Sequence, residues 1–229
     1  MVDVLARLNP LAIAHLVFFI GFIPWVVLRR SGRARPPNPA LRLHHYRYVC
    51  TQFALFALFS GVVARSLHIP LGGAPRHPLL DWTAAAALAA LFYFSLAPYR
   101  RERIARRDPH ALLLAPSPDR VGWWALVSLL AGVVEEFTYR GVASSILLWA
   151  GAPVWAAVLV VSAAFGLAHA GRGWVHVAVT FGIGALLHVL VLASGSLWPA
   201  MAAHAVYDFF AGLSFGRMAR EEAWSPDAA

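Results

Sequence analysis

The stretch from Val121 to Trp149 reads VGWWALVSLLAGVVEEFTYRGVASSILLW. It is long enough to cross the hydrocarbon core of a bilayer, which takes about 20 helical residues. Three ionisable residues interrupt it: Glu135, Glu136 and Arg140. Charged groups are costly at that depth, so those that are retained there are the first candidates for function. The stretch therefore predicts a transmembrane helix with a polar site inside it.

The apolar character extends over the whole chain of 229 residues. Apolar residues make up 60% of the chain and charged residues 13%, against roughly 45–50% and about 25% in soluble domains. The apolar stretches are Leu11 to Leu28, Tyr48 to Ala64, Trp82 to Tyr99, Val121 to Trp149, Pro153 to Ala170, Trp174 to Ala193 and Leu197 to Gly216. The predicted fold class is an all-α, polytopic transmembrane helical bundle of about seven spans, with the active-site core in the last four.

Arginine density predicts the orientation of the bundle. The connections from Arg29 to Arg47 and from Arg100 to Arg120 carry six arginines each, whereas the stretch from Arg65 to Asp81 carries two. By the positive-inside rule, the first two connections face the cytoplasm. Alternation then places the N-terminus outside and the C-terminus in the cytoplasm.

The net charge of +8 comes from arginines between the spans, so it indicates topology and we expect no nucleic-acid partner. Cys50 is the only cysteine. An internal disulfide and a cysteine-based metal cluster are therefore excluded.

The spacing of the three charged residues predicts different roles for the two glutamates. Glu136 and Arg140 are four apart, so on a helix they share a face and can form an ion pair. Glu135 points about 100° away and cannot use the same arginine. One carboxylate is thus neutralised, while the other is free to face a cavity as a general base would.

Two further spans contribute polar groups. His204 and Asp208 are four apart and share a helix face, and His169 ends the preceding Phe165-Gly166-Leu167-Ala168-His169 run. Together with Glu135 they supply what peptide hydrolysis requires: a base, a partner to hold the water and groups to stabilise the oxyanion. We interpret the other histidines of the spans as packing residues: His15, His176 and His188.

The polar residues form three motifs that follow one another along the chain. They are Glu-Glu-x-x-x-Arg at 135–140, Phe-x-x-x-His at 165–169 and His-x-x-x-Asp at 204–208. This pattern resembles the CAAX protease and bacteriocin-processing (CPBP, or Abi) family of intramembrane endopeptidases. The resemblance implies that Glu135 and His169 activate a water molecule, and that His204 and Asp208 form the oxyanion site. It implies a glutamate-type protease without a cofactor.

The resemblance assigns supporting roles as well. Glu136 and Arg140 become the supporting pair, and Phe165 packs beside His169. One position departs from the pattern, because many family members have asparagine where this chain has Asp208. An amide can donate a hydrogen bond, whereas an ionised carboxylate cannot. Asp208 must therefore carry a proton or act by orienting His204.

The motifs divide the chain into three parts. Residues 1–120 form the three N-terminal transmembrane spans with basic cytoplasmic loops, residues 121–216 form the CPBP-like catalytic transmembrane core, and residues 217–229 form a short cytoplasmic tail. A zinc-dependent version of the protease is the alternative for the core, because Glu135, His169 and His204 could make a zinc site with an open water position.

The function that we expect is hydrolysis of a peptide bond in a membrane protein or peptide substrate. The resemblance implies C-terminal or leader-peptide processing, including C-terminal sorting signals, in the inner membrane of a bacterial cell. Two other classes remain open. One is a non-catalytic membrane scaffold or bacteriocin-immunity protein, and the other is a proton-coupled transporter, since buried glutamate and histidine also suit proton relays.

The arginine distribution makes a prediction about topology. Reporters inserted near Arg33 and Arg106 should read as cytoplasmic, and a reporter near Gly73 as external, because arginine-rich loops stay in the cytoplasm. Alkaline phosphatase and green fluorescent protein fusions at the three positions measure this. The reverse pattern at all three positions would contradict the orientation.

Overall fold

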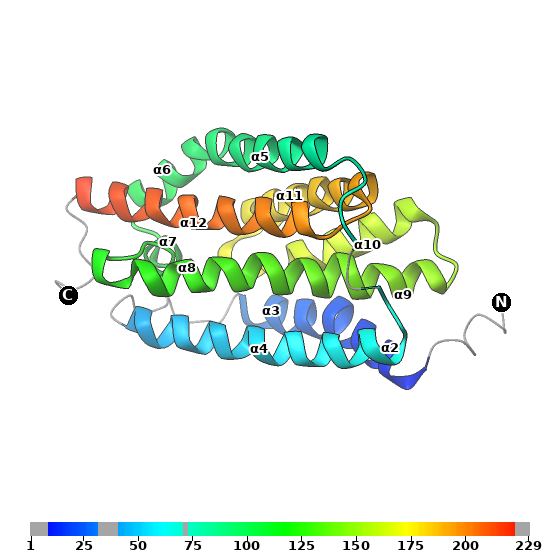
Figure 1. Cartoon of the computed structure of the whole chain (residues 1–229). Helices are drawn as coiled ribbons and strands as arrows, with labels where there is room; N and C mark the ends of the chain where they lie inside the picture. The colour runs from blue at the N-terminus through cyan, green and yellow to red at the C-terminus, as the bar shows by residue number, and fades with distance from the viewer. Residues whose placement is uncertain (1–8, 32–40, 71–72, 223–229) are drawn as a thin grey trace.

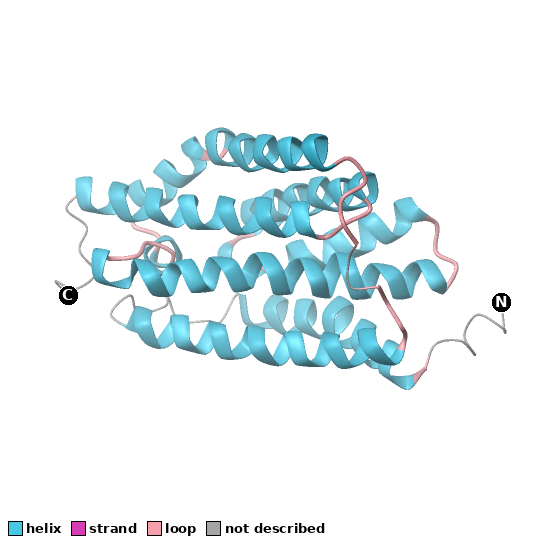
Figure 2. Cartoon of the chain, in the orientation of Figure 1, coloured by secondary structure: helices cyan, strands magenta, loops and turns pink. Residues whose placement is uncertain are grey.

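The computed structural model describes residues 9–31, 41–70 and 73–222, and within these ranges every regular element is a helix (Figure 2). The fold class predicted from the sequence is therefore confirmed. The first half consists of α2 (Pro10–Leu16), η1 (Val17–Phe22), α3 (Ile23–Ser31), α4 (Arg42–Ser66), α5 (Pro78–Ser95), α6 (Ala97–Ala105) and α7 (Pro109–Leu113). The second half consists of η3 (Pro118–Arg120), α8 (Val121–Leu130), η4 (Ala131–Glu135), η5 (Phe137–Ala143), α9 (Ser144–Trp149), α10 (Val154–Leu167), η6 (Ala170–Arg172), α11 (Trp174–Ser194) and α12 (Trp198–Glu221).

Five helical stretches of the described chain are long and apolar enough to cross a membrane: Pro10–Ser31, Arg42–Ser66, Pro78–Ala105, Pro118–Trp149 and Trp174–Ser194. All seven predicted spans are helical, but the count of seven is not confirmed. Helix α10 has 14 residues, fewer than the roughly 20 that cross the hydrocarbon core. Helix α12 is long enough at 24 residues but is not one of the five, and the polar His204 and Asp208 lower its hydropathy.

The helix ends follow local sequence signals. The side chain of Asn9 accepts a hydrogen bond from the backbone N–H of Ala12 at 2.9 Å, and a proline opens helix α2. Gly195 ends α11 in the left-handed region with φ 67°, where a residue without a Cβ is favoured. These signals explain why the apolar stretches start and stop close to where the sequence predicts.

The outer surface is apolar, as expected of a bundle in lipid. On α4, Leu55, Leu58 and Val62 are exposed at 60%, 66% and 47%, and their spacing places them on one helix face. Phe53 and Val63 are buried against neighbouring helices. The helix therefore has one apolar side that packs against its neighbours and a second apolar side that is exposed, as expected of a surface that contacts lipid.

Helix α12 lies between α5 and α8 and packs against both of them, and also against η4 and α11 (Figure 1). Its crossing with η4 depends on Gly132. A Cβ at this position would lie 2.6 Å from the backbone N of Ala205 and 2.7 Å from the backbone O of Met201. The two backbones therefore touch, as they do where small residues mediate helix packing in membranes. This contact brings the Glu135-Glu136 pair close to His204.

Candidate active site

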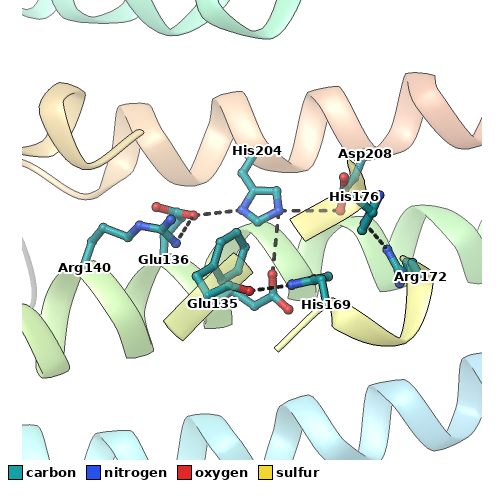
Figure 3. A network of polar contacts seen from close by, with 9 residues as sticks. Glu135, Glu136, Arg140, His169, Arg172, His176, His204 and Asp208 are labelled. Carbon is teal, nitrogen blue, oxygen red and sulfur yellow. Dashed lines mark hydrogen bonds and ion pairs between the residues drawn. The ribbon is translucent and has the colours of Figure 1, made fainter. Parts of the chain in front are cut away.

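The polar residues singled out in the sequence meet inside the bundle (Figure 3). They come from the chain around the end of η4, from the turn after α10 and from α12. One cavity is lined by all four residues expected to be catalytic, which are Glu135, His169, His204 and Asp208. The cavity walls also carry apolar side chains such as Phe53 and Val127. A polar cluster in an apolar cavity is the usual form of a ligand or active site.

Glu136 and Arg140 form the ion pair that their spacing predicts. The distance from Arg140 Nη1 to Glu136 Oε1 is 3.0 Å, and neither side chain is exposed. The Arg140 guanidinium also lies over the ring of Phe165, with Cζ 4.4 Å from the ring centroid. A buried charge is tolerated when it is paired in this way. The buried ion pair therefore lies next to the cavity and does not open to it.

The same carboxylate has a second partner from another helix. His204 Nδ1 lies 2.9 Å from Glu136 Oε1. A carboxylate engaged by Arg140 can only accept here, so Nδ1 carries the proton of this hydrogen bond. The other ring nitrogen, Nε2, then faces the cavity. Glu136 thus sets both the rotation and the tautomer of His204, as outer carboxylates do for catalytic histidines.

His204 Nε2 lies between two more carboxyl groups. It is 3.8 Å from Glu135 Oε2 and 3.6 Å from Asp208 Oδ2. The side chains of Glu135 and Asp208 are 18% and 29% exposed, so both reach the cavity, whereas Glu136 does not. Glu135 makes no ion pair with Arg140, as the helix geometry predicts. Both carboxyl groups therefore lie close to the ring nitrogen that faces the cavity.

His169 lies in the turn beyond α10, not within the helix as the sequence analysis expected, because α10 ends at Leu167. Its Nδ1 donates a hydrogen bond to the backbone oxygen of Phe165 at 2.8 Å. In the neutral ring, Nε2 is then free to accept a hydrogen bond. The Phe165 ring is 4.9 Å from the His169 ring and 6.0 Å from the His204 ring. Phe165 therefore packs beside His169, as the resemblance implies.

The backbone around the two glutamates is unusual. The segments η4 and η5, on either side of Glu136, are π-helical. Short π-helical segments are rare and occur frequently at functional sites. They differ from the regular α-helix that the sequence predicts here. The Glu136–Arg140 contact nevertheless forms, because the two residues remain on one side of the wider helix.

Gly184 of α11 is a site residue that the sequence analysis missed. A Cβ at this position would lie 2.6 Å from Arg140 Nη2 and 3.2 Å from Phe165 Cδ1. The glycine therefore makes room for the guanidinium and the ring that it covers. The available signal was a glycine within a helical stretch, which often marks a close approach.

The packing interpretation of two other histidines is consistent with their contacts. His15 Nε2 lies 3.1 Å from Ser60 Oγ, which hydrogen-bonds Thr138 of η5 at 3.0 Å. His188 Nε2 lies 3.0 Å from Ser144 Oγ. These buried bonds tie neighbouring helices to the segment that follows Glu136. His176 is different, because it lines the same cavity as the candidate catalytic residues.

A metal site is not formed by these side chains as they lie. Within residues 9–31, 41–70 and 73–222, no three or more histidine, cysteine, aspartate or glutamate side chains are grouped so that they could hold a metal ion. Independence from metal itself stays a prediction.

Comparison with protein families finds one match. Residues 117–210 match the family described as type II CAAX prenyl endopeptidase Rce1-like. The match agrees with the resemblance drawn from the three motifs, and it covers every residue discussed above between Glu135 and Asp208. The family supports an intramembrane protease in general. Comparison with curated proteins and with solved structures returned no match.

The buried pair predicts an asymmetry between two variants. Arg140→Ala should reduce the abundance of folded protein more than Glu135→Gln does, because it leaves Glu136 charged with only a histidine partner. Breaking a buried ion pair costs about 3–5 kcal/mol in soluble proteins. Fluorescence-detected size-exclusion chromatography of both variants, with and without heating, measures the difference. Equal abundance and equal melting would contradict the structural role of the pair.

Proposed function

We propose that this chain, whose residues 117–210 have the Rce1-like pattern, is an intramembrane endopeptidase that uses Glu135 to activate water. A single observation carries the proposal. Glu135, His169, His204 and Asp208 line one cavity within an apolar bundle, and Glu136 holds the cavity-facing histidine in place. This set contains each group that hydrolysis of an amide requires.

In the proposed reaction, a water molecule lies between the Glu135 carboxylate and His169. The carboxylate takes a proton from the water, while His169 Nε2 accepts its second hydrogen bond. The oxygen then forms a bond to the carbonyl carbon of the scissile peptide. A carboxylate that faces the cavity suits this task, because it can accept the proton as the water attacks.

His204 and Asp208 stabilise the oxyanion that this attack creates. With Nδ1 bound to Glu136, His204 presents Nε2–H to the developing negative charge, and the nearby carboxyl groups favour the protonated ring. Asp208 either donates a proton of its own or holds the charge on His204. The tetrahedral intermediate collapses when Glu135 passes its proton to the leaving amine and the C–N bond breaks.

The substrate class follows from the setting of the site. The cavity runs from Glu135 to side chains at the ends of the spans, among them Arg103 of α6 and Leu114. Arginine density assigns this end to the cytoplasm. We therefore propose a membrane-associated protein substrate cut near one of its ends, as in C-terminal or leader-peptide processing and sorting. The proposed location is a bacterial inner membrane.

Glu135→Gln should lower turnover by about 10²-fold to 10⁴-fold with substrate binding retained, because the amide cannot accept the proton of the water. The assay uses the full chain in proteoliposomes with a library of peptides that carry a hydrophobic segment, and mass spectrometry detects products. Glu102→Gln is the matched control, because Glu102 is an exposed carboxyl group paired with Arg106 on α6. A zinc chelator should leave wild-type turnover unchanged.

Several results would contradict the proposal. Unchanged turnover in Glu135→Gln would remove the base from the mechanism. Loss of folded Glu135→Gln protein, with no cleavage by the wild type, would favour a scaffold. Loss of turnover on chelation that added zinc restores would favour the zinc-dependent alternative.

Asp208→Asn distinguishes the two roles left to Asp208. If the carboxyl group acts as a protonated donor, asparagine supplies a donor at any pH, so activity persists and extends to higher pH. If its negative charge holds His204 charged, the variant loses turnover across the pH range. The distance of 3.6 Å between Asp208 Oδ2 and His204 Nε2 favours the second result. A pH profile of kcat and KM for both proteins measures it.

A further inference from the structure

The first two spans reach the candidate catalytic segment through a chain of buried hydrogen bonds. Helices α2 and α4 lie along the stretch that contains η4 and η5 (Figure 1). His15 Nε2 of α2 lies 3.1 Å from Ser60 Oγ of α4, and Ser60 Oγ lies 3.0 Å from Thr138 Oγ1 of η5. All three residues are buried. His15 and Ser60 lie outside residues 117–210, the part that matches the family, and none of the roles proposed above uses them.

The second nitrogen of His15 gives this chain a direction. His15 Nδ1 is buried and makes no hydrogen bond with the residues that the structure describes. A buried N–H without an acceptor is costly, so in the neutral ring Nε2 carries the proton and donates it to Ser60 Oγ. Ser60 then donates its own proton to Thr138 Oγ1. Both hydroxyl groups therefore have a defined partner, and a buried polar network of this kind makes the geometry around it more rigid.

Thr138 belongs to the π-helical segment that follows Glu136. It is three residues after Glu135 and is the second residue of η5. Hydrogen bonds in a π-helix span one residue more than those in an α-helix. A return to α-helical pairing would therefore rotate the residues before the segment by about 100° relative to those after it. A contact that holds Thr138 in place thus also restrains the direction in which Glu135 points.

Helix α4 connects this contact to the cavity wall. Its residue Phe53 lines the cavity together with Glu135 and forms a buried cluster with Val134 of η4. Ser60 follows Phe53 by seven residues, about two helical turns, so the two side chains share a face of α4. This face meets η4 before Glu135 and η5 after it. The hydrogen bond from Ser60 fixes the register of α4 against this stretch, which apolar contacts alone specify less strictly.

The first span also reaches His169, through a series of aromatic rings. The ring of Phe19 in η1 is 4.6 Å from that of His15 and 6.0 Å from that of Tyr139. Tyr139 lies 5.2 Å from Phe165, which in turn lies 4.9 Å from His169. The first span therefore supports both sides of the site where we place the attacking water.

We propose that His15, Ser60 and Thr138 are positioning residues. Their hydrogen-bonded chain holds the π-helical segment in the register that turns Glu135 into the cavity, so the first two spans belong to the catalytic unit. The proposal rests on the proposed protease function, because it concerns the direction of the proposed base. None of the three side chains touches the reacting atoms. Breaking the chain should therefore slow the chemical step and leave substrate binding nearly unchanged.

The kinetic test removes one hydroxyl at a time in the proteoliposome assay. Thr138→Val keeps the branching of the side chain and should lower kcat about 10-fold to 100-fold with KM nearly unchanged, because a shift of about 1 Å can cost such a factor. Thr138→Ser keeps the hydroxyl and should restore most of the rate. Ser60→Ala should act like Thr138→Val. The double variant should be no slower than the slower single variant, since both changes break the same bond.

Ser128→Ala is the matched control. Ser128 is a buried serine of α8 whose hydroxyl makes no hydrogen bond with the residues that the structure describes, so this variant should keep the kcat and KM of the wild type. His15→Phe keeps a ring beside two phenylalanines of the first two spans and loses the hydrogen bond. It should lower kcat by a smaller factor than Ser60→Ala, because Ser60 retains its bond to Thr138.

Three kinetic results would overturn the proposal. The first is an unchanged kcat in Thr138→Val, Ser60→Ala or His15→Phe. The second is a double variant in which the two losses multiply. The third is a smaller amount of folded protein with an unchanged kcat per folded molecule, which would assign the chain of hydrogen bonds to stability alone.

An accessibility measurement tests the proposal without hydrolysis. In a Cys50→Ala background, Glu135→Cys places a thiol at the cavity, and its labelling rate with a small water-soluble thiol reagent reports whether position 135 faces the cavity. Adding Thr138→Val or Ser60→Ala should slow the labelling several-fold, whereas Ser128→Ala should not change it. Slowed labelling supports the positioning even if the wild type hydrolyses no peptide, a result that would count against the protease alone. Equal labelling rates in all variants overturn the positioning, whether or not hydrolysis is found.

Discussion

The rest of the site depends on the contacts of the Glu136 carboxylate. This buried group binds both Arg140 and His204. Arg140 keeps the carboxylate charged within an apolar bundle, and the charged carboxylate fixes Nδ1 of His204. Because Nδ1 is occupied, Nε2 must face the cavity, where it meets Glu135 and Asp208. The two neighbouring glutamates therefore lie in different settings: Glu136 is buried between Arg140 and His204, whereas Glu135 faces the cavity.

Such a buried charged group constrains the packing around it. The loss of hydration has to be offset by close contacts on every side. Gly132 lets η4 touch α12, and Gly184 leaves space for the Arg140 guanidinium against the Phe165 ring. A Cβ at position 132 would collide with the backbone of α12, and a Cβ at position 184 would push against the Arg140 guanidinium. The two glycines and the ion pair thus belong to one arrangement.

The separation of charge along the cavity gives it a direction. Carboxyl groups gather around His204, whereas Arg172 lies beside α11 and α6 and is linked to them through His176 and Tyr99. The cavity therefore connects the candidate catalytic residues to α6 and α11, which hold Tyr99, Arg103 and His176.

The sequence by itself determined the relations that are local along the chain. Apolar runs predict helices, and a spacing of four predicts that Glu136 meets Arg140 and that His204 lies beside Asp208, because one helix turn fixes such neighbours. Only the tertiary structure decided that Glu136 also binds His204, that His169 lies beyond its helix, and that Arg172 is held through His176 and Tyr99. These relations join residues on different elements. They depend on how closely the helices approach at positions such as Gly132, which residue spacing within one helix does not encode.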